Sequence, residues 1–134
     1  MTREDLRVYK NNQEWINERF DYIEELRATI EKITTVLSDM PKGSRKVQDS
    51  MAEKVAQLQD SLGELMDRVV EADKKQKEIL NQLDKVEQPY RLILDKVYIQ
   101  GKSLVTVASE MNYNYKHICH KHGIALDKFD EQDK

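Results

Sequence analysis

Apolar residues in the first part of the chain recur at steps of three and four, the spacing of one helix face. They are Trp15, Ile16, Phe20, Ile23, Leu26, Ile30, Ile33 and Leu37. This pattern predicts a helix at about residues 5–38, and Thr2 with Asp5 forms a weak capping box at its start. Two successive steps of three, from Phe20 to Leu26, shift the face slightly, which overwinds a coiled coil locally.

A second run of apolar positions follows the a/d pattern of a coiled coil. Its eleven positions alternate between steps of four and three, and ten of them are apolar. They are Met51, Val55, Leu58, Leu62, Leu65, Val69, Ala72, Gln76, Ile79, Leu83 and Val86. A heptad sustained over five repeats predicts a coiled-coil helix at about residues 45–87. Ser50 with Glu53 makes a good capping box, although a start near Arg45 fits equally well.

The two helices are separated by a breaker, residues 39–44, which contains a proline and a glycine. Two helices of similar length joined in this way predict a long antiparallel hairpin over residues 1–88. The heptad serves either to join the helices of one chain or to join two chains. We favour self-association, because a two-helix seam leaves Trp15, Tyr22 and Met66 poorly covered.

Beyond Pro89 the pattern changes to shorter helices with short turns. Helices are predicted at about residues 90–99, 104–111 and 115–129, and Gly101 ends the first of them. Ser103 and Asn114 are the predicted N-caps of the second and third helices. The fold class is therefore all-α: a long antiparallel helical hairpin, then a three-helix domain at residues 89–129, then an acidic tail at residues 130–134.

The last two helices have the spacing of a helix-turn-helix. A small residue, Ala108, falls where the helices cross, and Asn112 falls in the turn, where a left-handed backbone is needed. Tyr113 closes the turn, and Ile118 anchors the following helix. The other predicted core positions of this pair are Val107, Met111, Ala125, Leu126 and Phe129.

Charge is distributed unevenly along the chain. The formal net charge is −3, and 35% of the residues are charged. Residues 1–88 hold 15 Lys and Arg against 19 Asp and Glu, whereas residues 89–129 hold 6 against 3. The two halves are thus expected to face different partners. A single cysteine, Cys119, and the absence of a signal-like or membrane-spanning stretch predict a cytoplasmic protein with no membrane partner.

Several short motifs together resemble a known family. The pair of C-terminal helices resembles the region-four helix-turn-helix of bacterial sigma factors, through Leu104, Val107, Ala108, Met111, Asn112, Tyr113, Asn114, Ile118, Ala125, Leu126 and Phe129. The lead-in from Tyr90 to Ser103 is similar to its preceding helix. Met40 to Ser44, the heptad helix and His120 to Leu126 resemble small phage-encoded sigma-like proteins of Firmicutes, related to late-operon regulators of the ArpU and RinA type. The likeness covers roughly residues 41–129.

The resemblance implies a phage or prophage transcription regulator whose last helix enters the major groove of double-stranded DNA. The implied contacts to bases or phosphates are Lys102, Ser103, Asn114, Tyr115, Lys116, His117, Cys119 and His120. The chain departs from the family in two ways. Its last predicted helix, the one implied to enter the groove and here called the reading helix, has no arginine, and Lys121 stands where the family usually has a buried aliphatic residue. The stem of Lys121 is expected to lie along the core with its ammonium outside.

Other chemistry is disfavoured. His117 with His120 and Cys119 with His122 have helical spacing, but the two pairs point to different faces and form no tetrahedral metal set. We expect no metal, no cofactor and no enzymatic activity. Three functions remain open: a DNA-binding regulator that self-associates as a homodimer or higher oligomer or contacts RNA polymerase, a DNA-packaging adaptor like a small terminase subunit, and a module that binds RNA polymerase without reading DNA.

Overall fold

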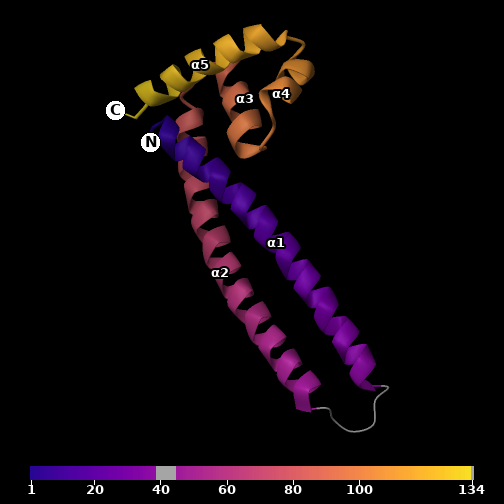
Figure 1. Cartoon of the computed structure of the whole chain (residues 1–134). Helices are drawn as coiled ribbons and strands as arrows, with labels where there is room; N and C mark the ends of the chain where they lie inside the picture. The colour runs from indigo at the N-terminus through magenta and orange to yellow at the C-terminus, as the bar shows by residue number, and fades with distance from the viewer. Residues whose placement is uncertain (39–44, 134) are drawn as a thin grey trace. The chain divides into compact units, whose positions relative to one another are not determined.

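The computed structural model describes residues 1–38 and 45–133, and these residues form helices joined by short connections (Figure 1). Two long helices come first, α1 (Arg3–Ser38) and α2 (Arg45–Leu83). They are followed by α3 (Tyr90–Leu94), the π-helical turn η1 (Asp95–Ile99), α4 (Leu104–Met111) and α5 (Tyr115–Glu131). The predicted breaker at residues 39–44 lies outside the described residues. Over the described ranges, no helix combines the length and the apolar character needed to cross a membrane.

The chain divides into two compact units. One unit, here called the terminal unit, contains residues 1–13 and 71–134, and the other, the middle unit, contains residues 14–70. The first turns of α1 therefore belong with the C-terminal helices. The predicted domain division between residues 88 and 89 runs inside the terminal unit.

The core of the terminal unit draws on every helix that enters it. Its buried apolar side chains are Leu6 and Tyr9 from α1, Ala72, Ile79 and Leu83 from α2, Val86, Ile93, Leu94, Val97, Tyr98, Val107, Ala108, Ile118, Ala125, Leu126 and Phe129. Apart from Ala108, six core positions were predicted in the last two helices. Five of them are buried, and the sixth, Met111, is half-buried. Burial of this apolar surface is the main stabilising contribution.

The long helices begin and end close to the predicted positions. α1 starts two residues earlier than predicted, and the Asp5 carboxylate accepts a hydrogen bond from the Thr2 N–H at 2.8 Å, as in a capping box. α2 starts at Arg45, the earlier of the two alternatives, and ends at Leu83 rather than residue 87. Tighter turns follow, in which the N–H of Lys85 bonds to Gln82 and that of Val86 to Leu83. Val86 remains buried beyond the helix end.

In the middle unit, Ile23 and Leu26 of α1 and Leu65 of α2 are buried. The prediction that Phe20 lies on the same face is wrong, because its side chain is 53% exposed. Two steps of three residues turn a helix by about 600°, so Phe20 and Leu26 point about 120° apart. The guanidinium groups of Arg19 and Arg68 lie over the Trp15 ring, at 5.1 and 4.6 Å from its centroid.

Candidate nucleic-acid interface

The connection between α4 and α5 reverses the chain at Asn112. This residue has φ 59° and ψ 37°, a left-handed conformation that asparagine tolerates better than most residues. The N–H of Tyr113 donates to the Ala108 carbonyl at 2.9 Å, which closes the end of α4. Val107 on one side and Ile118 on the other are fully buried. The predicted left-handed position and the predicted anchors are therefore confirmed.

Both helices of this pair begin at side-chain caps. The Ser103 hydroxyl accepts a hydrogen bond from the Thr106 N–H at 3.2 Å, and the Asn114 carbonyl oxygen accepts from the His117 N–H at 2.7 Å. Each bond satisfies one of the free N–H groups of a first turn. Two of the eight residues predicted to touch DNA thus fix the ends of the helices that carry the others.

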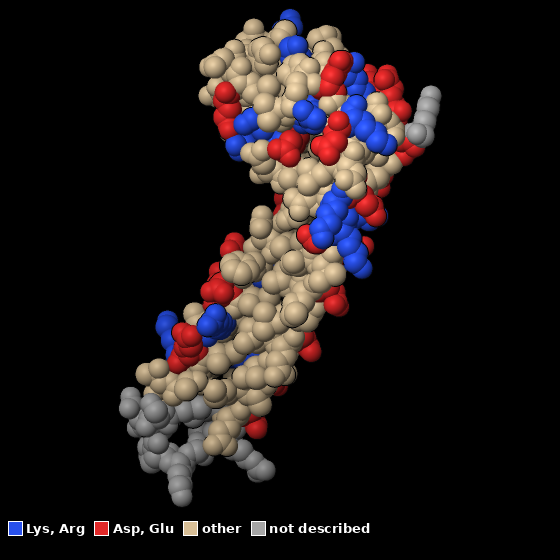
Figure 2. All heavy atoms as spheres, turned by 180° about the vertical axis from the view of Figure 1, so that it is seen from behind, with Lys and Arg blue, Asp and Glu red and all other residues tan. Residues whose placement is uncertain are grey.

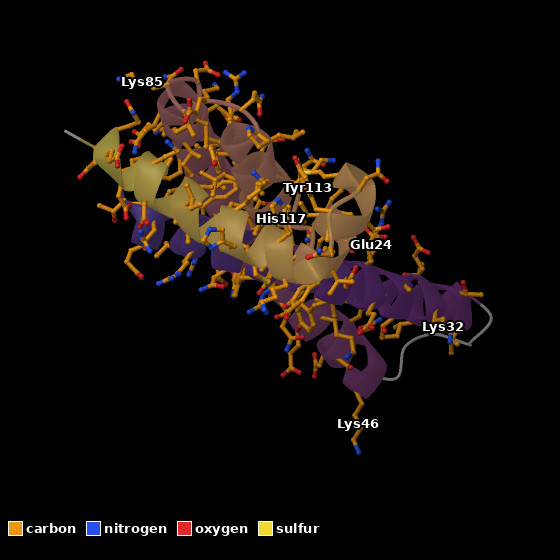
Figure 3. All side chains as sticks on the ribbon, turned by 90° about the horizontal axis from the view of Figure 1, so that it is seen from above. Glu24, Lys32, Lys46, Lys85, Tyr113 and His117 are labelled. Atoms are coloured by element: carbon orange, nitrogen blue, oxygen red, sulfur yellow. The ribbon has the colours of Figure 1, made fainter. Side chains whose placement is uncertain are left out.

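The first turns of α5 present an exposed polar surface. Tyr115 is 55% exposed, and Lys116, His117 and His120 are exposed as well. The centroid of the His117 ring lies 5.0 Å from that of the Tyr113 ring, and the two rings are tilted relative to each other. Figure 3 labels both residues. Cys119 is half-buried, between this surface and the core. The structure brings Tyr115, Lys116, His117 and His120 together on one helix, as the sequence predicts.

Lys102 forms an ion pair with Glu110 of α4. Its ammonium lies 2.6 Å from the carboxylate of Glu110, which also accepts from Lys96 at 3.3 Å. The hydrogen bond from Lys102, aided by Lys96, holds the pKa of Glu110 below its usual value. One carboxylate therefore neutralises part of the charge of two lysines beside the start of α4.

Lys121 and Lys128 on α5 lie against aromatic rings. The Lys121 ammonium is 5.4 Å from the centroid of Tyr90 and 5.6 Å from that of Tyr113. The Lys128 ammonium lies 5.2 Å from Tyr90 and 2.8 Å from the Glu87 carboxylate. Half-buried Lys121 thus places its charge near two rings, which stabilise it by cation–π attraction.

His122 belongs to the interior side of α5. Its Nε2 lies 2.9 Å from the hydroxyl oxygen of Tyr98, and the two rings stack at 5.7 Å. Burial lowers the pKa of His122, and nearby Lys10, Arg7 and Arg3 lower it further. Among the described residues, no group of histidine, cysteine and carboxylate side chains has the arrangement of a metal site.

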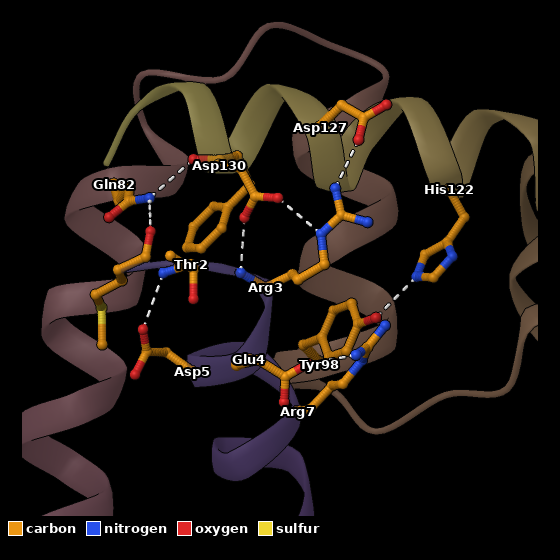
Figure 4. Close-up of polar contacts among 12 residues, drawn as sticks. Thr2, Arg3, Glu4, Asp5, Arg7, Gln82, Tyr98, His122, Asp127 and Asp130 are labelled. Carbon is orange, nitrogen blue, oxygen red and sulfur yellow. Dashed lines mark hydrogen bonds and ion pairs between the residues drawn. The ribbon is translucent and has the colours of Figure 1, made fainter. Parts of the chain in front are cut away.

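The first residues of α1 are joined to the end of α5 by polar contacts, shown in Figure 4. The Arg3 guanidinium donates to Asp130 at 2.7 Å and to Asp127 at 2.6 Å. The buried Gln82 amide donates to the carbonyls of Met1 at 2.7 Å and Phe129 at 2.9 Å. Sequence reasoning missed these contacts and treated residue 130 as the start of a tail. No local signal reveals them, because the partners are 47 to 127 residues apart.

Charges of both signs are intermixed over the terminal unit. On the face drawn in Figure 2, Lys and Arg side chains alternate with Asp and Glu over this part of the molecule. The excess of basic residues in segment 89–129 therefore does not by itself make one large basic patch on that face.

No protein-family model matches this chain, and comparison with curated proteins and with solved structures gives no significant match.

Proposed function

We propose that this chain is a sequence-specific DNA-binding transcription regulator, similar to phage sigma-like proteins, that uses α4 and α5 as a helix-turn-helix. The observation that carries the proposal is the left-handed reversal at Asn112 between two capped helices, with Tyr115, Lys116 and His120 exposed at the start of the second. In such pairs the second helix enters the major groove with its first residues toward the bases. The function requires no catalysis and no cofactor.

Gel-shift titration against phage promoter DNA, at several salt concentrations, tests this function. Lys116→Ala is expected to weaken binding and reduce the salt dependence, because each lost phosphate contact lowers the log–log slope by about 0.9. Lys74→Ala, an exposed lysine of α2 in the same compact unit, is the control and is expected to bind normally. Absence of a retarded species at micromolar protein and low salt contradicts the proposal.

Glu110→Gln is expected to strengthen DNA binding, whereas Lys116→Ala is expected to weaken it. It removes the carboxylate that holds Lys102 and Lys96, and so leaves both ammonium groups available to DNA phosphates. We expect tighter binding and a steeper salt dependence than in the unaltered chain, measured by fluorescence anisotropy. The double variant Glu110→Gln, Lys102→Ala is expected to lose most of that gain. Weaker binding by Glu110→Gln with an unchanged helix content contradicts a role for Lys102.

The second candidate is a module that binds RNA polymerase without reading DNA. It is favoured by the scarcity of lysine and arginine at the start of α5. Between residues 114 and 120, Lys116 is the one lysine or arginine. A pull-down with core polymerase separates the candidates when Lys116→Ala and His120→Ala are compared in both assays. The second candidate is favoured if the unaltered chain captures polymerase but binds no DNA, and if the variants lose polymerase capture.

Self-association through the middle unit is part of the proposal. The predicted seam positions Leu62 and Val69 are 39% and 45% exposed, and Met66 and Val70 beside them are more exposed still. A second copy covering them buries apolar surface that one chain leaves in water. Sedimentation of the unaltered chain is expected to give a dimer or higher oligomer. Leu62→Glu with Val69→Glu dissociates it, whereas the control pair Gln57→Glu with Gln59→Glu does not.

A further inference from the structure

Lys121 of α5, a residue outside the set that the sequence resemblance assigns to DNA, holds its ammonium group beside two tyrosine rings. The ammonium nitrogen lies 5.4 Å from the ring centroid of Tyr90, at the start of α3, and 5.6 Å from that of Tyr113, in the turn before α5. An ammonium group is attracted to the face of an aromatic ring. The two rings therefore restrict where the flexible side chain of Lys121 places its charge.

The charge of Lys121 has no acidic partner. Within residues 1–38 and 45–133, no carboxylate forms an ion pair with this ammonium, whereas Lys128 of the same helix is paired with Glu87 at 2.8 Å. The faces of the tyrosine rings offer no oxygen acceptor, so the three N–H donors of the ammonium remain available to a group from outside. An anionic oxygen is the acceptor that such a donor binds most strongly.

Ring contacts connect Lys121 to the exposed start of α5. The ring of Tyr113 lies 5.0 Å from that of His117, centroid to centroid, and His117 directly follows exposed Lys116. Lys121 comes four residues after His117, and residues at that spacing are neighbours on one side of a helix. Tyr113, His117 and Lys121 thus form one flank of the exposed surface that contains Lys116 and His120.

This flank faces the sugar–phosphate backbone if α5 lies in the major groove. Lys121 stands about 100° around the helix from His120, the rotation that one residue adds. A helix with its side chains is about 10–12 Å across and the groove is about 12 Å wide, so both flanks of an inserted helix face the groove walls. Tyr115 and Cys119, on the opposite flank, carry no positive charge. Lys121 therefore marks the flank that attracts phosphate.

We propose that Lys121 is a phosphate-binding residue, held in place by Tyr90 and Tyr113, that contacts the DNA backbone along one wall of the major groove. Because the rings restrict the side chain before DNA arrives, binding requires less ordering of it. The inference rests on the proposed DNA-binding function and adds to it a contact that the sequence resemblance does not imply. Since every nucleotide carries the same phosphate, Lys121 contributes affinity and register but no base preference.

Fluorescence anisotropy with a duplex selected by the unaltered chain, over a series of KCl concentrations, tests the contact. Lys121→Gln is expected to lower the log–log salt slope by about 0.9 and to weaken binding by the same factor for selected and base-substituted duplexes. Lys121→Arg keeps the charge and is expected to keep the slope. The matched control Lys74→Gln removes an exposed lysine of α2 in the same unit and is expected to leave binding unchanged.

The role of the rings is tested by Tyr90→Leu, alone and combined with Lys121→Gln. Alone, Tyr90→Leu is expected to weaken DNA binding roughly twofold to tenfold, the cost of ordering one long side chain on binding. In the Lys121→Gln background it is expected to have no further effect. Equal weakening in both backgrounds overturns the role of Tyr90 in holding Lys121.

The phosphate contact and the proposed function fail in distinguishable ways. If the unaltered chain binds DNA and Lys116→Ala weakens it, but Lys121→Gln leaves the salt slope unchanged, the phosphate contact is overturned and the proposed function stands. Lys121→Met removes the same charge with an apolar side chain, and it replaces Lys121→Gln in this comparison if urea denaturation shows that the glutamine variant does not fold. If the unaltered chain binds no DNA, both proposals are overturned.

Discussion

At the residue scale, the fold depends on a few positions whose backbone or environment admits few side chains. Asn112 adopts a left-handed conformation that most residues reach only at a cost of about 1–2 kcal/mol. Gly101, with φ 71°, ends the π-helical turn under the same constraint. Both were predicted from the sequence, because turn chemistry depends on the residue itself. His122 is different, since its surroundings come from three separate helices.

Asn112→Ala is expected to lower the free energy of unfolding by about 1 kcal/mol, because the methyl group of alanine cannot form the local hydrogen bonds by which asparagine stabilises a left-handed backbone. Asn112→Gly is expected to leave stability within a few tenths of a kcal/mol, since glycine reaches this conformation without strain. Urea denaturation followed by circular dichroism measures both. Equal stabilities of the two variants contradict this account of the turn.

Stability is expected to depend on pH through His122. Burial, with the charges of Lys10, Arg7 and Arg3, lowers the pKa of His122 in the folded chain. The unfolded chain therefore takes up the proton at higher pH, and the stability contributed by neutral His122 is present above about pH 6.5 and lost as the pH falls. Urea midpoints compared between about pH 7.5 and 5.5 measure this loss.

His122→Gln, which keeps a polar partner for the Tyr98 hydroxyl, is expected to reduce that pH dependence. His120→Gln changes an exposed residue two positions away and is the matched control. Retention of the full dependence in His122→Gln contradicts the assignment to this histidine.

At the element scale, α4 and α5 are short helices whose beginnings are fixed by their own sequences. Ser103 and Asn114 supply the cap oxygens, and each helix starts at the residue predicted. Capping is a bond between residues three apart, so it is visible in a sequence. The π-helical turn η1 was not predicted, because a wider turn has no comparable signature in apolar spacing. It carries Tyr98, which contacts His122 on α5.

The cap and the DNA contact of Asn114 can be separated by substitution. Asn114→Ala removes the bond to the His117 N–H and is expected to lower stability by about 1 kcal/mol. Asn114→Asp keeps a cap acceptor and therefore the stability, but it places a negative charge where DNA is proposed to bind. We expect wild-type urea midpoints and weakened duplex binding for Asn114→Asp. Wild-type binding by this variant contradicts the placement of Asn114 at the interface.

At the scale of the whole molecule, the unit that contains α5 is assembled from both ends of the described chain. Leu6 and Tyr9 of α1 are buried in it, and Arg3 joins α1 to Asp127 and Asp130. Gln82 supports the same junction through two carbonyls. The first thirteen residues therefore complete the core on which the proposed reading helix rests.

A fragment of residues 89–134 is expected to lack a cooperative unfolding transition, because it loses Leu6, Tyr9, Ile79 and Leu83 from its core. Within the full chain, Gln82→Ala is expected to lower the free energy of unfolding by about 1–3 kcal/mol, since two carbonyls lose their donor. Asn81→Ala, at the exposed neighbouring position, is the control. A sharp transition of the fragment, matching that of the full chain, contradicts this description of the core.

Apolar spacing, caps and turn residues in the sequence determined the all-helical class, the two long helices and the reversal at Asn112. Those features depend on hydrogen bonds and side-chain periodicity within a few residues. Only the tertiary structure decided that α1 closes against α5, that Phe20 faces solvent, that Glu110 holds Lys102 and that Lys121 lies near Tyr90 and Tyr113. These features depend on contacts between different helices, or on which side of a helix faces the core, so packing rather than local preference sets them.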